Sequence, residues 1–236
     1  MKTSMHIAVL GANGRTGSHV VQQALERGYA VTAVVRDVLS MQNIQHECLK
    51  VHPANILDSA ALVSCLKGVD AVVSCVGTKG FGQYLPWSSV SIYSEATKSV
   101  LGAMRESGVN RYVCMAGTCL KYGPGQPKII THVFKPLFGG IAKDMSRMED
   151  ILTAEENSDI NFTVVKPNAL KEAPITEGEV FAAEGQWCDG CIISRPDVAR
   201  FILDSLTTNQ WDRKLVAIKT EQDQNVNESK QKKVPM

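Results

Sequence analysis

Three glycines at a spacing of three residues come directly after a short apolar run near the start of the chain. The run is IAVL at residues 7–10, and Gly11, Gly14 and Gly17 follow it in the stretch GANGRTG. Glycine loses more conformational entropy on folding than any other residue, so this cluster needs a structural reason. A turn of this composition between a strand and a helix directs backbone N–H groups and the positive end of the helix dipole at an anion.

The three positions have separate expected roles. Gly11 would permit the tight turn, Gly14 would let a pyrophosphate approach the backbone, and Gly17 would let the helix pack closely on the strand. A glycine motif alone is weak evidence, but a preceding strand and a following helix are the context that supports it. The stretch therefore predicts a dinucleotide-binding turn; an ordinary turn is the alternative.

Apolar strand-like runs alternate with helical patterns along the rest of the chain. The predicted strands are residues 6–10, 30–36, 71–76, 111–116, 161–166 and 214–218, and the predicted helices are residues 18–27, 59–66, 90–107, 143–156 and 196–207. This alternation is typical of βαβ units, with helices on both faces of a parallel sheet. The chain of 236 residues is long enough for one such domain. We therefore predict an α/β fold: a Rossmann-like, doubly wound parallel sheet in a single domain over residues 1–218.

Two segments depart from the alternation. Residues 119–142 are rich in glycine and proline and follow a predicted strand. Ligands of open α/β sheets bind outside the carboxyl ends of the strands, so this segment is predicted to be a substrate lid loop, with a passive connector as the alternative. Residues 219–236 are almost devoid of apolar side chains, which predicts a disordered tail.

The overall composition narrows the class of partner. The formal net charge is +1, from 25 basic and 24 acidic residues. Such a balance argues against nucleic acid and against a membrane surface as partners. The amino-terminal residues do not resemble a signal peptide or a membrane span, and the seven cysteines are an odd number, which favours a reducing compartment. We predict a cytoplasmic protein, and no feature of the sequence indicates an obligate oligomer, so we predict a monomer.

The end of the second predicted strand indicates which dinucleotide would bind. An NAD site usually offers an acidic residue there, to accept a hydrogen bond from the ribose hydroxyl. This chain has Arg36 at that position, and a planar guanidinium suits bidentate binding of a 2′-phosphate. Arg15 could hold the same phosphate from the other side, and Asp37 is interpreted as a turn residue. The predicted cofactor is NADP(H).

Several stretches of the chain occur together in one known family. They are GANGRTG, VVRD, VDAVVSCVGTK, YSEATKSVLGAMRESGVNRYV, SRMEDIL and ISRPDVARFILDSLTTNQWD, and they cover most of residues 5–212. With these motifs the chain resembles the NADPH-dependent flavin reductase/biliverdin-IXβ reductase family of atypical short-chain dehydrogenases. Some of the motifs are shared with the wider NmrA-like group. The resemblance implies a small planar substrate, a flavin or a linear tetrapyrrole, that accepts hydride from NADPH.

The resemblance also implies a set of site residues along the cofactor. The residues expected at the pyrophosphate, the 2′-phosphate, the adenine, the ribose and the nicotinamide are, in that order, Gly11, Asn13, Gly14, Arg15, Thr16 and Gly17; Arg36 and Ser40; Asn55 and Ile56; Val76, Gly77 and Thr78; and Tyr93, Met115, Pro167, Asn168 and Ala169.

Some positions depart from the family pattern. The family has a serine where this chain has Gly117, and a histidine where it has Asn168; Tyr93 and Lys98 are five residues apart rather than four. Hydride chemistry belongs largely to the cofactor, so turnover does not require the missing groups. Thr118 and Asn168 are the predicted catalytic residues, each as a hydrogen-bond donor to the acceptor; a strand-end hydroxyl and a turn asparagine are the structural alternatives.

Other interpretations stay open. An NmrA-like redox sensor would bind NADP(H) without turnover, and a quinone-type reductase would use a different acceptor. Cys188 and Cys191 form a CxxC pattern around an Asp-Gly turn, where two thiols flanking a turn are favoured over a redox pair. Ile192 and Ile193 predict a short strand directly after it. No set of metal ligands at a matching spacing is present, so no metal is predicted.

Overall fold

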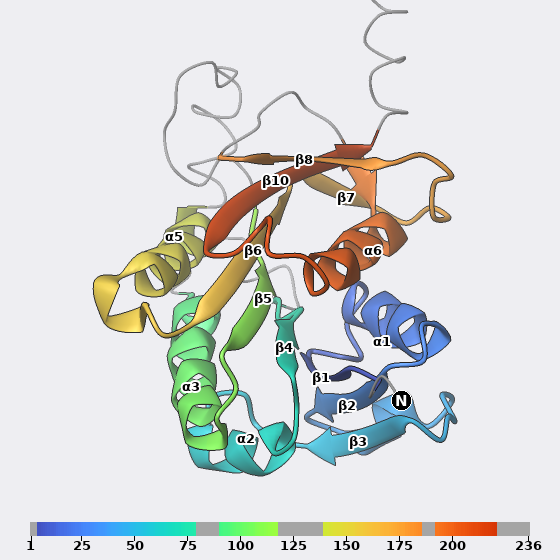
Figure 1. The fold of residues 1–236 in the computed structure, drawn as a ribbon, viewed down its shortest axis with the longest axis vertical. Coiled ribbons are helices and arrows are strands. Elements are labelled where there is room, and N and C mark those ends of the chain that lie inside the picture. The colour runs from blue at the N-terminus through green and yellow to red at the C-terminus, as the bar shows by residue number, and fades with distance from the viewer. Residues whose placement is uncertain (1–3, 79–89, 118–138, 186–191, 221–236) are drawn as a thin grey trace, which may run out of the picture.

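A computed structural model describes residues 4–78, 90–117, 139–185 and 192–220. Its centre is an eight-stranded sheet in the order β3-β2-β1-β4-β5-β6-β10-β8 (Figure 1). All neighbouring strands are parallel except β8, which runs antiparallel to β10 at one edge. The strands are β1 His6–Leu10, β2 Ala30–Val35, β3 Leu49–Pro53, β4 Ala71–Ser74, β5 Arg111–Met115, β6 Asn161–Pro167, β8 Val180–Glu184 and β10 Lys214–Thr220.

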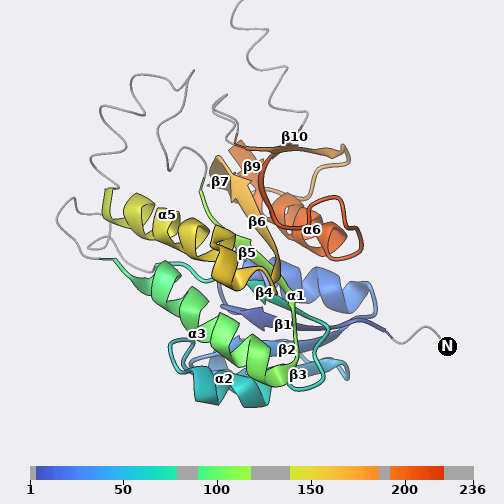
Figure 2. The same ribbon diagram turned by 60° about the vertical axis from the view of Figure 1, so that its left-hand side comes forward.

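Helices cover both faces of the sheet (Figures 1 and 2). One face carries α1 (Gly17–Glu26) and α6 (Arg195–Ser205); the other carries α2 (Ser59–Leu66), α3 (Ile92–Ser107) and α5 (Gly139–Thr153). Two short 3₁₀ helices, η1 and η4, span Val38–Met41 and Glu155–Asn157, and β7 (Ala169–Lys171) pairs in parallel with β9 (Ile192–Ser194) as a separate ribbon. The predicted doubly wound, Rossmann-like single domain is confirmed.

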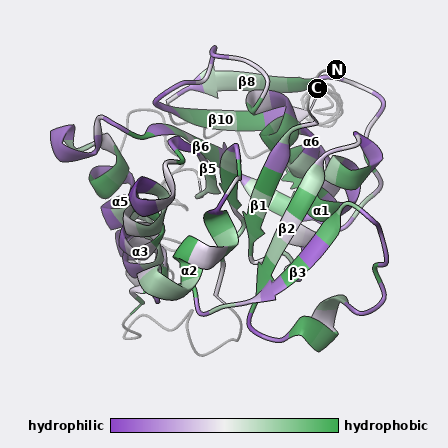
Figure 3. Cartoon of the chain, turned by 60° about the horizontal axis from the view of Figure 1, so that its bottom comes forward, coloured by the Kyte–Doolittle hydropathy of each residue, from purple (hydrophilic) through white to green (hydrophobic). Residues whose placement is uncertain are grey.

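The core consists of two apolar layers, one on each side of the sheet. Central strands read as continuous apolar runs, such as AVTAVV in β2, because both of their faces are buried. The edge strand β3 alternates apolar and polar residues instead (LKVHP), and its hydrophilic positions are visible in Figure 3. This construction leaves the carboxyl ends of the central strands as the edge where a ligand can reach the sheet.

Every predicted helix and strand is present, with ends shifted by a few residues, and Ile192 and Ile193 do form a strand, β9. The largest shift is at α5, which begins at Gly139 rather than at residue 143. The last four residues of the predicted lid loop are therefore its first turn. The two glycines at its start concealed it, although Ile141, Met148 and Leu152 are all buried and continue one helical stripe.

The carboxyl-terminal boundary also differs from the prediction. β10 continues through Thr220, whose backbone pairs with Val180 of β8, and Lys219 and Thr220 are 8% and 1% exposed. The domain therefore extends beyond residue 218, because pairing with β8 buries two polar residues that composition assigned to the tail. Residues 118–138 and 221–236, with most of the predicted lid and tail, lie outside the described residues, as do Cys188 and Cys191.

Candidate functional site

The glycine-rich turn joins β1 to α1, and two of its glycines have no room for a side chain. Gly11 has a φ of +71°, and a Cβ there would lie 2.9 Å from the carbonyl oxygen of Cys75. A Cβ on Gly17 would overlap the carbonyl oxygen of Gly11. The roles expected for Gly11 and Gly17, a left-handed turn and close helix–strand packing, are therefore both present.

The same turn presents backbone donors at the amino end of α1. Gly14 N–H donates to the Gly11 carbonyl oxygen (2.9 Å) and Ser18 N–H to that of Gly14 (2.9 Å). Among the described residues, the N–H groups of Arg15 and Thr16 have no acceptor, and the Thr16 side chain makes no capping bond to the helix. Free N–H groups together with the positive end of the helix dipole suit a bound anion. This arrangement fits a dinucleotide pyrophosphate.

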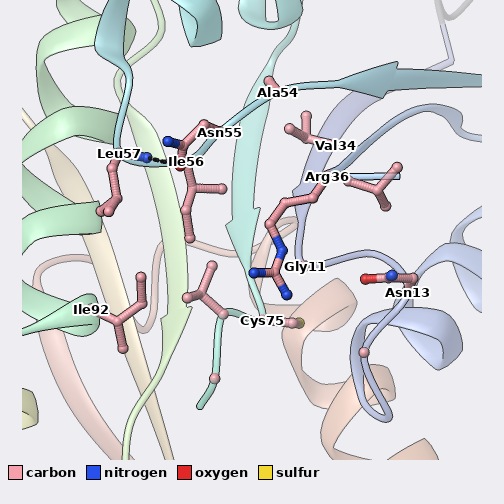
Figure 4. Close-up of a pocket in the computed structure, with 14 residues that line it drawn as sticks. Gly11, Asn13, Val34, Arg36, Ala54, Asn55, Ile56, Leu57, Cys75 and Ile92 are labelled. Carbon is pink, nitrogen blue, oxygen red and sulfur yellow. Dashed lines mark hydrogen bonds between the residues drawn. The ribbon is translucent and has the colours of Figure 1, made fainter. Parts of the chain in front are cut away.

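A pocket of about 200 Å³ opens beside this turn, at the carboxyl ends of β1, β2 and β4. The strand order reverses between β1 and β4, which is where open α/β sheets bind ligands. Figure 4 shows the arrangement. The pocket is lined by Gly11, Asn13, Gly14, Val34, Val35, Arg36, Ala54, Asn55, Ile56, Leu57, Cys75, Val76, Gly77 and Ile92.

The pocket brings together most of the predicted residues for the adenosine half of a dinucleotide. They come from four separate segments: Gly11, Asn13 and Gly14; Arg36; Asn55 and Ile56; and Val76 and Gly77. Sequence reasoning missed the apolar walls, including Val34, Leu57 and Ile92. The positions of Val34 at the end of β2 and of Leu57 beside a predicted adenine residue were the available signals.

Arg36 and Asp37 have different roles at the rim of the pocket. Figure 4 shows the Arg36 side chain extending over the pocket toward the Gly11 turn, and no described residue forms an ion pair with it. The carboxylate of Asp37 instead accepts a hydrogen bond from Leu39 N–H (3.0 Å), which caps η1. The interpretation of Asp37 as a turn residue is confirmed. A free guanidinium is therefore the charged group that a ligand meets there.

Asn13 and Ser40 connect the glycine turn to η1. The Asn13 side-chain amide donates to Ser40 Oγ (2.9 Å), and Ser40 Oγ donates to the Asp37 carbonyl oxygen (2.5 Å). Both were predicted to contact the cofactor, and both hold the rim of the pocket in place.

Arg15 lies elsewhere. Its guanidinium is 3.7 Å from Glu172 Oε1 and its side chain is 75% exposed; it is not among the residues that line the pocket with Arg36. Glu172 also binds Arg195, whose Nε donates to the same oxygen (2.6 Å). Arg195 in turn donates from Nη1 to Thr16 Oγ1 (3.2 Å). Sequence reasoning identified neither Arg195 nor Glu172 as a site residue.

The residues predicted to surround the nicotinamide come from the end of β5, from the turn after β6 and, for Tyr93, from the first turn of α3. Thr78 N–H is 3.4 Å from the hydroxyl oxygen of Tyr93, and Tyr93 N–H donates to Asp144 Oδ2 (2.8 Å). Met115 ends β5, and Pro167, Asn168 and Ala169 connect β6 to β7. The predicted catalytic residue Thr118 lies outside the described residues, and Asn168 is half-buried at the turn.

The titratable groups near these strand ends are not poised as nucleophiles. Burial raises the pKa of the Cys75 thiol to about 12, so the thiolate is disfavoured. Burial likewise raises the pKa of Cys114, with a further contribution from the charge of Glu149. The part of the chain that the structure describes holds no cluster of three or more side chains able to ligate a metal, and none of its helices is long and apolar enough to cross a membrane.

Comparison of the sequence with those of known proteins identifies the family of this chain. The profile of a family described as NAD(P)H-binding matches residues 11–209. An uncharacterized chloroplastic protein of Arabidopsis thaliana is 30% identical over 219 residues, which is 90% of this chain and 75% of that protein. The divinyl chlorophyllide a 8-vinyl-reductase of the same plant is 26% identical over 85% of this chain, which spans only about half (49%) of the enzyme. A cytoplasmic location for the present chain stays a prediction, since these plant relatives are chloroplastic.

Solved structures share the fold. A short-chain dehydrogenase/reductase of Veillonella parvula, solved with NADP, has a TM-score of 0.74 at 16% identity, covering 93% of this chain and 96% of that one. A candidate NADH-flavin reductase of Streptococcus pneumoniae has a TM-score of 0.69 at 21% identity, covering 92% of this chain and 100% of that one.

Proposed function

The chain belongs to the NAD(P)H-binding family, and we propose that it is an NADPH-dependent reductase that transfers hydride to flavins and to linear tetrapyrroles of the biliverdin type. The bound dinucleotide supplies the hydride; the protein binds and orients both reactants and encloses the reacting atoms. The predicted monomeric state is part of the same proposal.

Arg36 is the observation that carries the preference for NADPH. Its guanidinium lies at the rim of the pocket with no ion-pair partner among the described residues, and the neighbouring carboxylate of Asp37 is used in capping. A 2′-phosphate would receive charge-assisted hydrogen bonds from Arg36, whereas the ribose hydroxyl of NADH would find no free carboxylate of the usual kind.

The residues predicted near the nicotinamide favour an acceptor that does not need a proton donor from the protein. Tyr93 and Asn168 offer a hydroxyl and an amide that can orient the carboxamide or the acceptor. Lys166, the charged residue beside Pro167, is fully buried and paired with Glu149. An isoalloxazine spreads the charge of the incoming hydride over its ring system and can take its proton from water, so the absence of the family's serine and histidine is compatible with flavin reduction.

The relatives support a reductase with a conjugated acceptor. A structural neighbour is a candidate NADH-flavin reductase, and several relatives are named as reductases of divinyl chlorophyllide a. Since this chain spans about half of the latter enzymes (49% and 53%), their activity is not carried over as a whole. Divinyl chlorophyllide a is one acceptor to include in the assay.

The second candidate function is a sensor that binds NADP(H) without turnover. Gly117 and Asn168 favour it, because each stands where the family has a group able to handle protons. Such a protein would report the redox state of the nicotinamide to a partner.

The test measures the loss of absorbance of the reduced nicotinamide as the purified chain oxidises it. The acceptor in each reaction is FMN, biliverdin-IXβ, a quinone or divinyl chlorophyllide a. Each acceptor is assayed with NADPH and with NADH. Turnover of FMN with NADPH supports the flavin reductase. Turnover of the quinone alone would show that a quinone, and not a flavin, is the acceptor. Tight NADPH binding without turnover of any acceptor would favour the sensor.

Arg36→Ala tests the cofactor preference in the same assay. We expect NADPH binding to weaken by about 2 kcal/mol, at the lower end for charged hydrogen bonds because the side chain is exposed. NADH serves as the internal control, since it lacks the 2′-phosphate. Equal weakening of both dinucleotides would contradict the role given to Arg36.

A further inference from the structure

Two arginines connect α1 to α6, one at each end of this helix pair. At the carboxyl ends, Arg27 Nη1 donates to Asp204 Oδ1 (2.7 Å). At the amino ends, Arg195 Nη1 donates to Thr16 Oγ1 (3.2 Å). The two contacts are about 16 Å apart along α1. Only the second lies at the glycine-rich turn.

The small ribbon β7–β9 determines where Arg195 and Glu172 meet. Its last paired residues are Lys171 and Ser194, so Glu172 and Arg195 occupy the next register position as each strand ends. Ser194 also caps α6, accepting a hydrogen bond from Asp197 N–H (3.2 Å). The Arg195 side chain is consequently 14% exposed and held in one direction, toward Thr16.

The charges at this place do not balance. Arg15 and Arg195 share a single carboxylate, Glu172, with contacts of 3.7 Å and 2.6 Å to the same oxygen. The partial positive charge of the α1 amino terminus adds to the two guanidinium groups. The N–H groups of Arg15 and Thr16 have no acceptor in the described part of the chain. The region therefore has an excess of positive charge and of hydrogen-bond donors.

We propose that Arg195 is a cofactor-binding residue that contacts the pyrophosphate of the dinucleotide from the α6 side, and that Glu172 is an internal counter-ion which the pyrophosphate replaces. The proposal rests on the proposed function only in requiring a dinucleotide ligand; it holds for NADP and NAD alike and for any acceptor.

Two variants test the two halves of the proposal. Arg195→Met keeps the length and the apolar stem of the side chain but removes its charge. Glu172→Gln keeps the shape of the side chain but removes the competing anion. Arg27→Met is the matched control, because it removes an arginine contact between the same two helices away from the turn.

Calorimetric titration of the full chain with NADP⁺, NAD⁺ and adenosine 2′-monophosphate gives the readout. The last probe fits the adenosine pocket but has no pyrophosphate. Arg195→Met should weaken NADP⁺ and NAD⁺ binding by about tenfold each, as for a lost charged hydrogen bond, and leave adenosine 2′-monophosphate unchanged. Glu172→Gln should tighten both dinucleotides by about threefold, within the range of an exposed ion pair. Arg27→Met should bind all three as the parent does.

Several results would overturn the proposal. Unchanged dinucleotide affinity in Arg195→Met, or an equal loss for adenosine 2′-monophosphate, would remove Arg195 from the site. Weaker dinucleotide binding in Glu172→Gln would show that the carboxylate positions Arg195 and does not compete. If Arg195→Met fails to fold, Arg195→Lys and Glu172→Gln still test whether these two residues affect dinucleotide affinity. Failure of flavin turnover or of NADPH preference would leave these affinities untouched, so the two proposals fail separately.

Discussion

The ion pair between Lys166 and Glu149 is buried and makes a sharp prediction about stability. Lys166 on β6 is 0% exposed and Glu149 on α5 is 1% exposed, with 2.5 Å between Nζ and Oε1. Neither the ammonium nor either carboxylate oxygen has a hydrogen bond of good geometry among the described residues. The pair is thus held by charge attraction in an apolar layer that includes Met148, Leu152 and Val164.

Removing one partner leaves the other charge buried without compensation. Lys166→Met or Glu149→Leu should therefore each destabilise the fold by about 3–5 kcal/mol, which corresponds to about 6–20 °C in melting temperature for a chain of this size. The double substitution removes both desolvation penalties and should cost about 1 kcal/mol or less, or stabilise the protein. The double variant is thus expected to be more stable than either single variant.

Reversible urea unfolding of the four proteins, with the m-value as a check on the extent of unfolding, measures this cycle. The exposed pair of Lys98 and Glu95, at 2.9 Å and with side chains 59% and 52% exposed, is the matched control. Lys98→Met should cost less than about 1 kcal/mol. The reasoning is refuted if the buried single variants lose no more than this control, or if the double variant loses the sum of both.

Three further predictions concern the turn, the α6 cap and the pocket thiol. Gly17→Ala places a methyl group against the Gly11 carbonyl. The free energy of unfolding, measured with urea, should fall by about 1–3 kcal/mol, and the dinucleotide affinity, measured by calorimetry, should fall as well. Asp197→Ala removes a fully buried carboxylate that binds Arg200 at 2.9 Å; a loss of about 3 kcal/mol is expected, and a near-neutral effect in urea unfolding would contradict it. The Cys75 thiol has its pKa raised from 9.0 to about 12, so the folded state keeps a proton that the unfolded chain releases. Its contribution to stability is complete below pH 9 and is lost between pH 9 and 12, by about 1.4 kcal/mol per pH unit; Cys75→Ser should flatten that part of a stability–pH curve.

Much of the fold could be predicted because local signals agree with the tertiary structure. The run at residues 7–10 and the glycines after it specify a strand, a turn and a helix without help from the rest of the chain. The strands β3, β7 and β8 were missed because they are short or lie at edges, where polar residues interrupt the apolar pattern. Their existence depends on the neighbouring strands β2, β9 and β10, which sequence periodicity does not reveal.

The candidate site was predictable to the extent that it is built from strand ends. Arg36 lies just past the end of β2, and the motif register locates it directly. Arg15 was predicted to share its phosphate, yet its side chain lies by Glu172, because the direction of an exposed side chain in a turn depends on the partners available. The contact of Glu172 with Arg195 required the pairing of β7 with β9, a register between segments that are far apart in the sequence.

The two arginines at the site differ in how far the fold depends on them. Arg36 extends from the end of an intact strand and has no ion-pair partner among the described residues; we propose that it contacts a phosphate that only one of the two dinucleotides carries. Arg195 begins α6, follows the capping residue Ser194, and binds both the glycine turn and the segment after β6. Preference between NADP and NAD can therefore change at the rim without disturbing the sheet. Under the proposal for Arg195, affinity for the shared pyrophosphate depends instead on a residue that also contacts Thr16 at the amino end of α1.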